Sequence, residues 1–259
     1  MDLQLNDKVI LVSGGAKGIG LGICQQLIQE GAIPVIAGRD ANDNQKAVAQ
    51  LTATGGQAYA IEAELSNPDA CKMVLDAVMA KYGRLDGLVN NAGANDGVGL
   101  ENGDYQRFIK SLHNNLVHYY LLAHYALPAL KASKGSIVNI TSKTAETGQG
   151  GTSAYAAANG GRNALTREWA VELLPYHIRV NAIVVAECWT PLYENWINTF
   201  ANPQEKRSAI EQHIPLAKRM TTADEIGAMA VFLLSEKSAH TTGQLIHVDG
   251  GYVHLDRAL

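Results

Sequence analysis

The sequence lacks the features that mark secreted, membrane and nucleic-acid-binding proteins. Its three cysteines, Cys24, Cys71 and Cys188, are scattered and form no CxxC pair, which is typical of reduced thiols in a cytosolic protein. No run is long and apolar enough to span a bilayer, and the first residues show no basic region followed by an apolar stretch. Twenty-one Lys and Arg against 25 Asp and Glu leave no basic excess, which argues against nucleic acid as the main partner. We therefore expect a soluble, cytoplasmic protein with no metal site and no contact with membranes or nucleic acids.

Linkers, repeats and low-complexity tracts are absent too, and 259 residues, 47% of them apolar, fit one large α/β domain over 1–259. Short apolar runs alternate with patterns of helical period. We expect strands at Lys8–Ser13, Ile33–Ala37, Gln57–Ala63, Leu85–Asn90, Gly135–Thr141, Ile178–Val185 and Gln244–Val248. We expect helices at Gly18–Glu30, Asn42–Ala53, Pro68–Lys81, Asp104–Leu130, Thr152–Leu174 and Thr222–Leu234. This alternation predicts a doubly wound parallel sheet of about seven strands with helices on both faces.

One long stretch, Ala186–Met220, follows the sixth expected strand and shows no regular period. Long irregular segments inside compact domains are usually functional, and ligands of such sheets bind at the carboxyl ends of the strands. We therefore expect a substrate lid at 186–220.

A glycine-rich turn, Ser13-Gly14-Gly15-Ala16-Lys17-Gly18-Ile19-Gly20, joins the first strand to the first helix. Such a turn lets the backbone approach a pyrophosphate, and the helix N-terminus supplies N–H donors and the positive end of a dipole. A tight turn without a ligand is the alternative. The position of the turn inside a run of βαβ units favours nucleotide binding.

With three further motifs, this turn resembles the short-chain dehydrogenase/reductase family over about Lys8 to Gly251. Asn90-Asn91-Ala92-Gly93 is similar to the family's NNAG motif, Ser142 matches its serine, and Tyr155 follows 13 residues later at the usual spacing. Asn115 matches the family's active-site asparagine. The resemblance implies a Rossmann-type fold and hydride transfer between a nicotinamide cofactor and a CH–OH group. It implies Tyr155 as the proton acceptor, Ser142 on the substrate oxygen, and Asn115 bending its helix and binding a water in a proton relay.

The same resemblance implies a set of cofactor-binding positions that come from the strand ends and the loops after them. They are Ser13, Gly14, Lys17, Gly18, Ile19, Gly20, Gly38, Arg39, Glu64, Leu65, Asn90, Ala92, Gly93, Tyr155, Asn159, Cys188 and Thr190. Two of the segments depart from the family pattern. Glu64 stands where an aspartate is usual, and Val185-Ala186 replaces the usual Pro-Gly.

The largest departure concerns the family pattern Tyr-x-x-x-Lys, which is Tyr155-Ala156-Ala157-Ala158-Asn159 in this chain. Positions 155 and 159 share a helix face. The family's lysine hydrogen-bonds the ribose and lowers the pKa of its tyrosine, and an amide can do only the first. A cation about 4 Å away at an effective dielectric of about 20 is worth roughly 4 kcal/mol, or about three pKa units. The sequence therefore predicts a slow site that Asn159→Lys restores.

Three interpretations of Asn159 remain open at this point. The chain is an inactivated or engineered variant of an active enzyme, a natural but weak enzyme, or a nucleotide-binding sensor or scaffold that no longer catalyses. Intact Ser142, Tyr155 and Asn115 favour an enzyme over the sensor.

The end of the second strand favours NADP as the cofactor. Gly38 offers no acid to repel a 2′-phosphate, and Arg39 and Lys17 can pair with one. NAD is the alternative, with Asp40 on the ribose.

The substrate-side segment Glu187–Trp196 and the tail after Gly251 resemble members of the family that oxidise L-fucose and related aldoses. Tryptophans can stack on a pyranose, and acids can accept its hydroxyls. The expected substrate-binding residues are Asn95, Asp96, Ser142, Lys143, Glu187, Trp189 and Trp196. Steroids, fatty-acyl groups and small ketones are the alternatives.

Family members are commonly tetramers. The expected helices Asp104–Leu130 and Thr152–Leu174 carry apolar residues on more than one side, which suits a face shared with a second subunit. We therefore expect a homotetramer.

Overall fold

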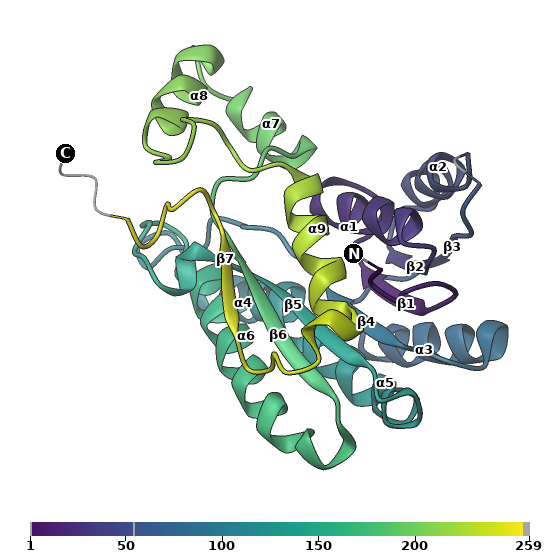
Figure 1. Ribbon diagram of the computed structural model, residues 1–259. Coiled ribbons are helices and arrows are strands. Elements are labelled where there is room, and N and C mark those ends of the chain that lie inside the picture. The colour runs from purple at the N-terminus through teal and green to yellow at the C-terminus, as the bar shows by residue number, and fades with distance from the viewer. Residues whose placement is uncertain (1, 54, 256–259) are drawn as a thin grey trace.

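Seven parallel strands form one sheet in the order β3-β2-β1-β4-β5-β6-β7 (Figure 1). The computed structural model describes residues 2–53 and 55–255. The strands are β1 Val9–Ser13, β2 Ile33–Gly38, β3 Tyr59–Glu62, β4 Gly87–Asn90, β5 Ser136–Ser142, β6 Arg179–Val185 and β7 Leu245–Val248. The chain builds outward from β1 to β3, returns to β4 beside β1, and then builds outward to β7. This reversal leaves a crevice at the carboxyl ends of β1 and β4, where sheets of this kind bind ligands.

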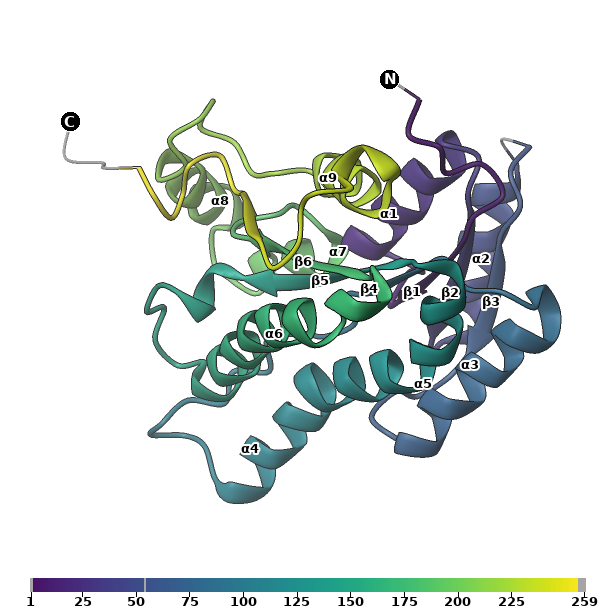
Figure 2. The ribbon, with the colours of Figure 1, turned by 60° about the horizontal axis from the view of Figure 1, so that its bottom comes forward.

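Helices cover both faces of the sheet. Figure 2 shows α1 and α9 on one side of the sheet and α3, α4, α5 and α6 on the other. Their bounds, with those of the remaining helices, are α1 Gly18–Gln29, α2 Ala41–Thr52, α3 Pro68–Tyr82, α4 Tyr105–Leu112, α5 His118–Ser133, α6 Ser153–Glu172, α7 Pro191–Ile197, α8 Pro203–Gln212 and α9 Ala223–Leu234. The predicted fold class is confirmed, and each predicted strand overlaps an observed one.

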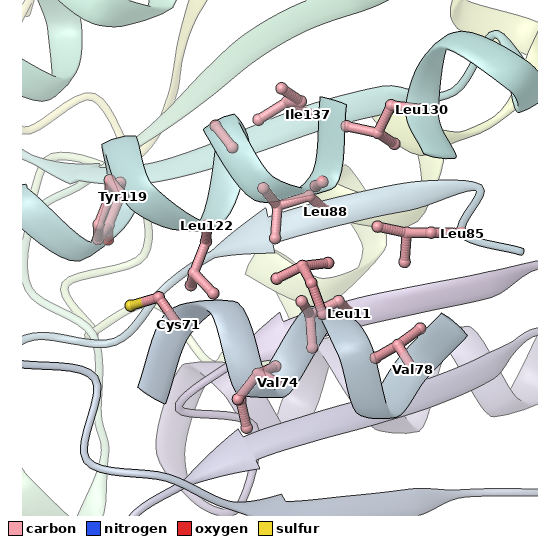
Figure 3. Close-up of a cluster of buried hydrophobic side chains, with 14 of the residues drawn as sticks. Leu11, Cys71, Val74, Val78, Leu85, Leu88, Tyr119, Leu122, Leu130 and Ile137 are labelled. Atoms are coloured by element: carbon pink, nitrogen blue, oxygen red, sulfur yellow. The ribbon is translucent and has the colours of Figure 1, made fainter. Parts of the chain in front are cut away.

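Helices cover both faces of the sheet, and because both faces are buried the strands are almost continuous apolar runs, as is typical of parallel sheets. On the face in Figure 3, Leu11, Leu88 and Ile137 of three neighbouring strands meet Val74 of α3 and Leu122 of α5. Each of these side chains is at most 1% exposed. Truncating one of these side chains to alanine lowers the free energy of unfolding by roughly 2–5 kcal/mol in such a core. A core packed in this way holds the strand ends in fixed positions.

The single helix predicted at Asp104–Leu130 is interrupted. A π-helical turn, His113–Val117, separates α4 from α5. It contains Asn115, and such turns are often found at functional sites.

The segment predicted as an irregular lid, Ala186–Met220, contains α7 and α8. That prediction was wrong about its irregularity. Both helices lie beyond the carboxyl edge of the sheet, on the side of α9 (Figure 1). Among the residues that the structure describes, no helix has the length and apolar character that a membrane crossing requires.

Candidate active site

The glycine turn leaves the first turn of α1 open. Gly14 and Gly18 adopt positive φ values of 66° and 57°, which glycine reaches without strain. A side chain at Gly20 would collide with the carbonyl oxygen of Gly14. Lys17, the N-cap residue of α1, makes no side-chain capping hydrogen bond, and the first turn holds no acid. Its N–H groups therefore fit a pyrophosphate.

Two polar side chains fasten this turn to the end of β4. The Ser13 hydroxyl accepts hydrogen bonds from the backbone N–H groups of Asn91 (2.9 Å) and Ala92 (3.1 Å). The Asn91 amide donates to the Ser13 carbonyl at 3.0 Å. Asn90 is fully buried and donates to Asn139 on β5 at 3.0 Å. The side chain of Asn90 therefore serves the fold, while Ala92 and Gly93 continue into the crevice.

The two cations expected to favour a 2′-phosphate already have carboxylate partners. Lys17 Nζ lies 2.5 Å from Asp43 Oδ2, and Arg39 Nη1 lies 3.7 Å from Glu64 Oε2. Neither pairing was predicted from the sequence, because each joins residues from different elements. Gly38 has no room for a side chain, since the Asn44 amide lies against it and donates to its carbonyl at 2.9 Å.

The segment after β6 lies close to the glycine turn. A Cβ on Gly18 would stand 3.5 Å from Thr190, whose hydroxyl caps α7 by accepting from the Tyr193 N–H at 3.2 Å. Cys188 is buried and pairs with Thr221 in an isolated β-bridge. Burial raises the pKa of the Cys188 thiol to about 12, so this side chain remains a neutral thiol. Leu65 is also buried, and its carbonyl accepts a hydrogen bond from the Cys71 thiol at 3.5 Å.

Ser142 and Tyr155 come from neighbouring elements. Ser142 ends β5, and its hydroxyl accepts from the Thr144 N–H at 3.3 Å. Tyr155 lies in the first turn of α6 and is half-buried. A hydroxyl at a strand end and a phenol on the following helix are therefore accessible at the carboxyl edge of the sheet.

Asn115 ties the π-helical turn to the loop after β4. Its Oδ1 accepts from the Ala94 N–H at 2.9 Å, and its Nδ2 donates to the Ser111 carbonyl at 3.1 Å. The predicted distortion of the helix at Asn115 is observed. Its backbone carbonyl accepts from Arg162 Nε at 2.6 Å, so a guanidinium occupies this acceptor.

Asn159 is fully buried, and both ends of its amide have partners. Nδ2 donates to the Tyr155 carbonyl at 2.8 Å, and Oδ1 accepts from Arg162 Nη1 at 3.0 Å. Arg162 was not among the site residues predicted from the sequence. Its position, three residues after Asn159 and seven after Tyr155 on one helix face, was the available signal.

A buried ionic group lies directly after Ser142. Lys143 Nζ pairs with Glu187 Oε1, and the Tyr193 hydroxyl donates to Glu187 Oε2 at 2.6 Å. The Lys143 ammonium also stands 4.1 Å from the ring centre of Tyr252. Burial, with the Glu187 charge, raises the pKa of Tyr193 well above its ordinary value. The structure thus brings two predicted substrate residues, Lys143 and Glu187, together.

Aromatic rings extend from this group along α7. The Arg207 guanidinium lies 4.1 Å from the ring centre of Trp189. Tyr193 packs edge-on against Trp196, with their ring centres 5.3 Å apart. Trp196 is 45% exposed. A hollow of about 560 Å³ opens beside Lys143 and Tyr252.

Asn95 and Asp96 lie on the exposed loop after β4. Asn95 Oδ1 accepts from the Gly97 N–H at 3.1 Å, and Asp96 accepts from the Ser111 hydroxyl at 2.9 Å. The Asn95 side chain is therefore bonded within its own loop, and the Asp96 side chain is bonded to Ser111 of α4.

One cluster of possible metal ligands occurs in the described part of the chain, although the sequence suggested no metal site. Glu146, His247 and His254 place ligand atoms within 4.8 Å of one another. His247 Nε2 lies 2.9 Å from Glu146 Oε2, and His247 Nδ1 lies 3.3 Å from His254 Nε2. The three side chains thus form a hydrogen-bonded chain among themselves.

Sequence comparisons place this chain among known oxidoreductases. The family model described as "Enoyl-(Acyl carrier protein) reductase" matches residues 14–253. An L-fucose dehydrogenase from Oryctolagus cuniculus is 36% identical over 248 residues, which cover 94% of this chain and 84% of the relative. A cyclopentanol dehydrogenase from Comamonas testosteroni is 31% identical over 250 residues, covering 96% and 98%.

Solved structures agree with this assignment. The crystal structure of Cj0485 dehydrogenase superposes with a TM-score of 0.95 at 47% identity, covering 100% of this chain and 99% of that one. A ligand-free aldohexose dehydrogenase from Thermoplasma acidophilum gives a TM-score of 0.90 at 26% identity with the same coverage. Since the family model matches nearly the whole chain, the protein belongs to the short-chain dehydrogenase/reductase family and is an NAD(P)-dependent oxidoreductase acting on CH–OH groups.

Proposed function

We propose that this enzyme oxidises the CH–OH group of an aldose such as L-fucose, with NADP as the preferred cofactor. The observation that carries the sugar assignment is the buried group of Lys143, Glu187 and Tyr193 directly after Ser142. Carboxylate, ammonium and phenol groups held by one another offer both donors and acceptors to a substrate rich in hydroxyls.

A bound nicotinamide nucleotide supplies the hydride acceptor, and the remaining work falls to residues of this chain. Ser142 Oγ donates a hydrogen bond to the substrate oxygen and stabilises the charge that develops on it. The Tyr155 oxygen accepts the hydroxyl proton as the C–H bond breaks. The open first turn of α1, with Gly14 and Gly18, holds the pyrophosphate.

The rings along α7 support a sugar over a flat apolar substrate. Trp196, 45% exposed on α7, offers a face on which the C–H side of a pyranose can stack, and Trp189 before α7 offers the face that Arg207 leaves uncovered. The Glu187 carboxylate, held by Lys143 and Tyr193, can accept hydroxyls. Two similar proteins that are named for sugar substrates, an L-fucose dehydrogenase and an aldohexose dehydrogenase, support this proposal. Because a cyclopentanol dehydrogenase is also similar to this chain, a simple alcohol is the alternative substrate.

The preference for NADP rests on Arg39 and Lys17 at the edge of the glycine turn. Their carboxylate pairs are exposed, with the Arg39 side chain 80% and the Lys17 side chain 67% accessible. Exposed ion pairs contribute about 0–1 kcal/mol, so a 2′-phosphate can exchange for a carboxylate at little cost. Asp40 instead caps α2, accepting from the Asp43 N–H at 2.9 Å.

The test is nucleotide reduction by the purified enzyme with NADP or NAD and four substrates: L-fucose, a second aldose, cyclopentanol and, with the reduced nucleotide, a 3-oxoacyl thioester. We expect an aldose to exceed cyclopentanol in kcat/KM by about tenfold or more. Tyr193→Phe should raise KM for the aldose and leave the cofactor affinity unchanged. Glu194→Gln, an exposed acid on the same helix, is the control. If cyclopentanol or the thioester is the better substrate, the sugar assignment is wrong.

A nucleotide sensor on the same fold is the alternative that the missing lysine at position 159 suggests, while Ser142, Tyr155 and Asn115 favour an enzyme. The same assay separates the two proposals. Binding of the nucleotide without turnover of any substrate, between pH 7 and pH 10, would support the sensor and contradict the enzyme.

We also propose a homotetramer. Exposed apolar side chains on α5 and around the end of α6, namely Tyr120, Val171, Leu174 and Tyr176, support a shared face. A mass of one 27.7 kDa chain in light scattering would exclude it.

A further inference from the structure

Arg162 is a buried charge without a charged partner. It is 3% exposed, and it forms no ion pair among the residues that the structure describes. A guanidinium does not lose its proton in proteins. Burying a charge without a charged partner costs free energy of folding. We therefore looked for a role of Arg162 in the active site.

Four contacts hold the guanidinium in place. Nε donates to the Asn115 carbonyl at 2.6 Å, and Nη1 donates to the Ile140 carbonyl at 3.2 Å and to Asn159 Oδ1 at 3.0 Å. The guanidinium carbon stands 4.1 Å from the ring centre of Tyr119. The π-helical turn, β5, α6 and α5 therefore converge on one cation.

The remaining nitrogen, Nη2, has no hydrogen-bond partner. It faces the end of β4, since a Cβ on Gly93 would lie 2.7 Å from it. The loop after β4 borders the nucleotide crevice. Nη2 is itself buried, so the guanidinium acts on the crevice through space and not by contact with a ligand.

We propose that Arg162 supplies the positive charge of this active site, in place of a lysine at position 159, and that Asn159 serves to hold it. Arg162 lies two helical turns after Tyr155 on the same face, and helical side chains lean toward the N-terminus. The guanidinium thus reaches back to Asn159, whose amide links it to the Tyr155 backbone. Arg162 stabilises the Tyr155 phenolate through space and is a positioning residue. This inference rests on the proposed hydride transfer.

The other titratable groups around this site carry no free charge near neutral pH. Burial, with Arg162 adding to it, lowers the pKa of His118 to about 4. Burial raises the pKa of Tyr119 well above its ordinary value; Arg162 opposes this rise and Tyr155 adds to it. Lys143 is paired with Glu187. Among these groups Arg162 is therefore the permanent charge without a charged partner.

The test compares Arg162→Met, which removes the charge, with Arg162→Lys, which keeps it. Arg167→Met, at an exposed arginine on the same helix, is the matched control. The first readout needs no substrate: near-ultraviolet absorbance titration of each protein against the same protein carrying Tyr155→Phe. An opposite unit charge near a titrating group, at an effective dielectric of about 20, moves the pH midpoint of its ionisation by about 1–2 units. We expect that shift upward for Arg162→Met and a much smaller one for Arg162→Lys.

The second readout is the pH profile of hydride transfer in a single turnover. At pH 7, Arg162→Met should be about 10- to 100-fold slower than the unmodified enzyme, and the difference should close toward pH 10. Arg162→Lys should recover most of the rate. A purely structural role would lower the rate equally at every pH.

Each outcome has a distinct meaning. If the phenolate midpoint of folded Arg162→Met equals that of the unmodified protein, the inference is overturned. If the midpoint moves but no substrate is oxidised by the unmodified enzyme, the proposed function fails while the charge assignment stands. Arg162→Gln, which retains an amide that can hydrogen-bond, takes the place of Arg162→Met if the latter does not fold.

Discussion

Asn159→Lys is the substitution for which sequence and structure predict opposite results. From the sequence alone, it adds a missing cation and restores a fast reaction. In the structure, the new ammonium enters a fully buried position beside the Arg162 guanidinium. The two charges cannot both be accommodated without loss, so we expect a less stable protein with no gain in rate.

The size of this loss follows from the contacts of Asn159. Two unit charges about 4 Å apart at an effective dielectric of about 20 repel by roughly 4 kcal/mol. The two hydrogen bonds of the amide, at 2.8 and 3.0 Å, are worth about 1 kcal/mol each. Because a lysine can move or lose its proton, we expect a net loss of about 2–5 kcal/mol, which lowers the melting temperature by roughly 5–15 °C.

A double-mutant cycle with Arg162→Met measures the conflict directly. Combining Asn159→Lys with Arg162→Met leaves one cation, so the double variant should be more stable than Asn159→Lys alone and at least as fast as Arg162→Met. Thermal melts and single-turnover rates at pH 7 on all four proteins complete the cycle. Ala157→Lys, at an exposed position of α6, controls for adding a lysine.

The opposite result would be equally clear. If Asn159→Lys melts at the temperature of the unmodified protein and transfers hydride faster, Arg162 does not act as the cation of the site. The prediction made from the sequence would then stand.

Three further predictions concern stability and cofactor choice. Burial lowers the pKa of His118 from about 6.5 to about 4. Between these pH values the unfolded chain binds a proton that the folded chain excludes, so stability falls as the pH drops. In denaturant titrations, the unmodified protein should therefore lose about 2.5 kcal/mol more free energy of unfolding between pH 7 and pH 4.5 than His118→Gln loses. Thr222→Ala removes the capping box of α9, which should cost about 1 kcal/mol and lower the melting temperature by roughly 2–4 °C. Arg39→Ala should weaken NADP about tenfold in calorimetry and leave NAD unchanged; equal losses for both nucleotides would show that Arg39 does not face the 2′-position.

Local patterns in the sequence predict most of the scaffold. A buried parallel strand is an apolar run wherever it lies, so the run Lys8–Ser13 predicts β1 within one residue. The lid helices were missed although their signals are present. Thr190-Pro191 and Asn202-Pro203 are N-cap and first-turn pairs, but the helices are too short for a clear apolar period.

The features missed at the site depend on contacts between distant segments. The family resemblance implied a bend at Asn115, but the full break between α4 and α5 depends on the bond of Asn115 to the Ala94 N–H, 21 residues away. The pairs of Lys17 with Asp43 and of Arg39 with Glu64 join separate elements. No periodicity in one element reports on such contacts, so free cations were predicted where the structure has ion pairs.

Arg162 also bears on how Asn159 is to be interpreted. A lysine replaced by asparagine in an otherwise unchanged site would leave a shortened side chain with free polar atoms. In this structure both ends of the Asn159 amide have partners, and the guanidinium that binds one end is held by three other elements. Because a lysine at 159 beside the arginine at 162 would cost about 2–5 kcal/mol, asparagine is the better residue at 159 once an arginine stands at 162. The structure therefore favours a natural enzyme whose active-site charge has moved by one helical turn over a protein disabled at a single residue.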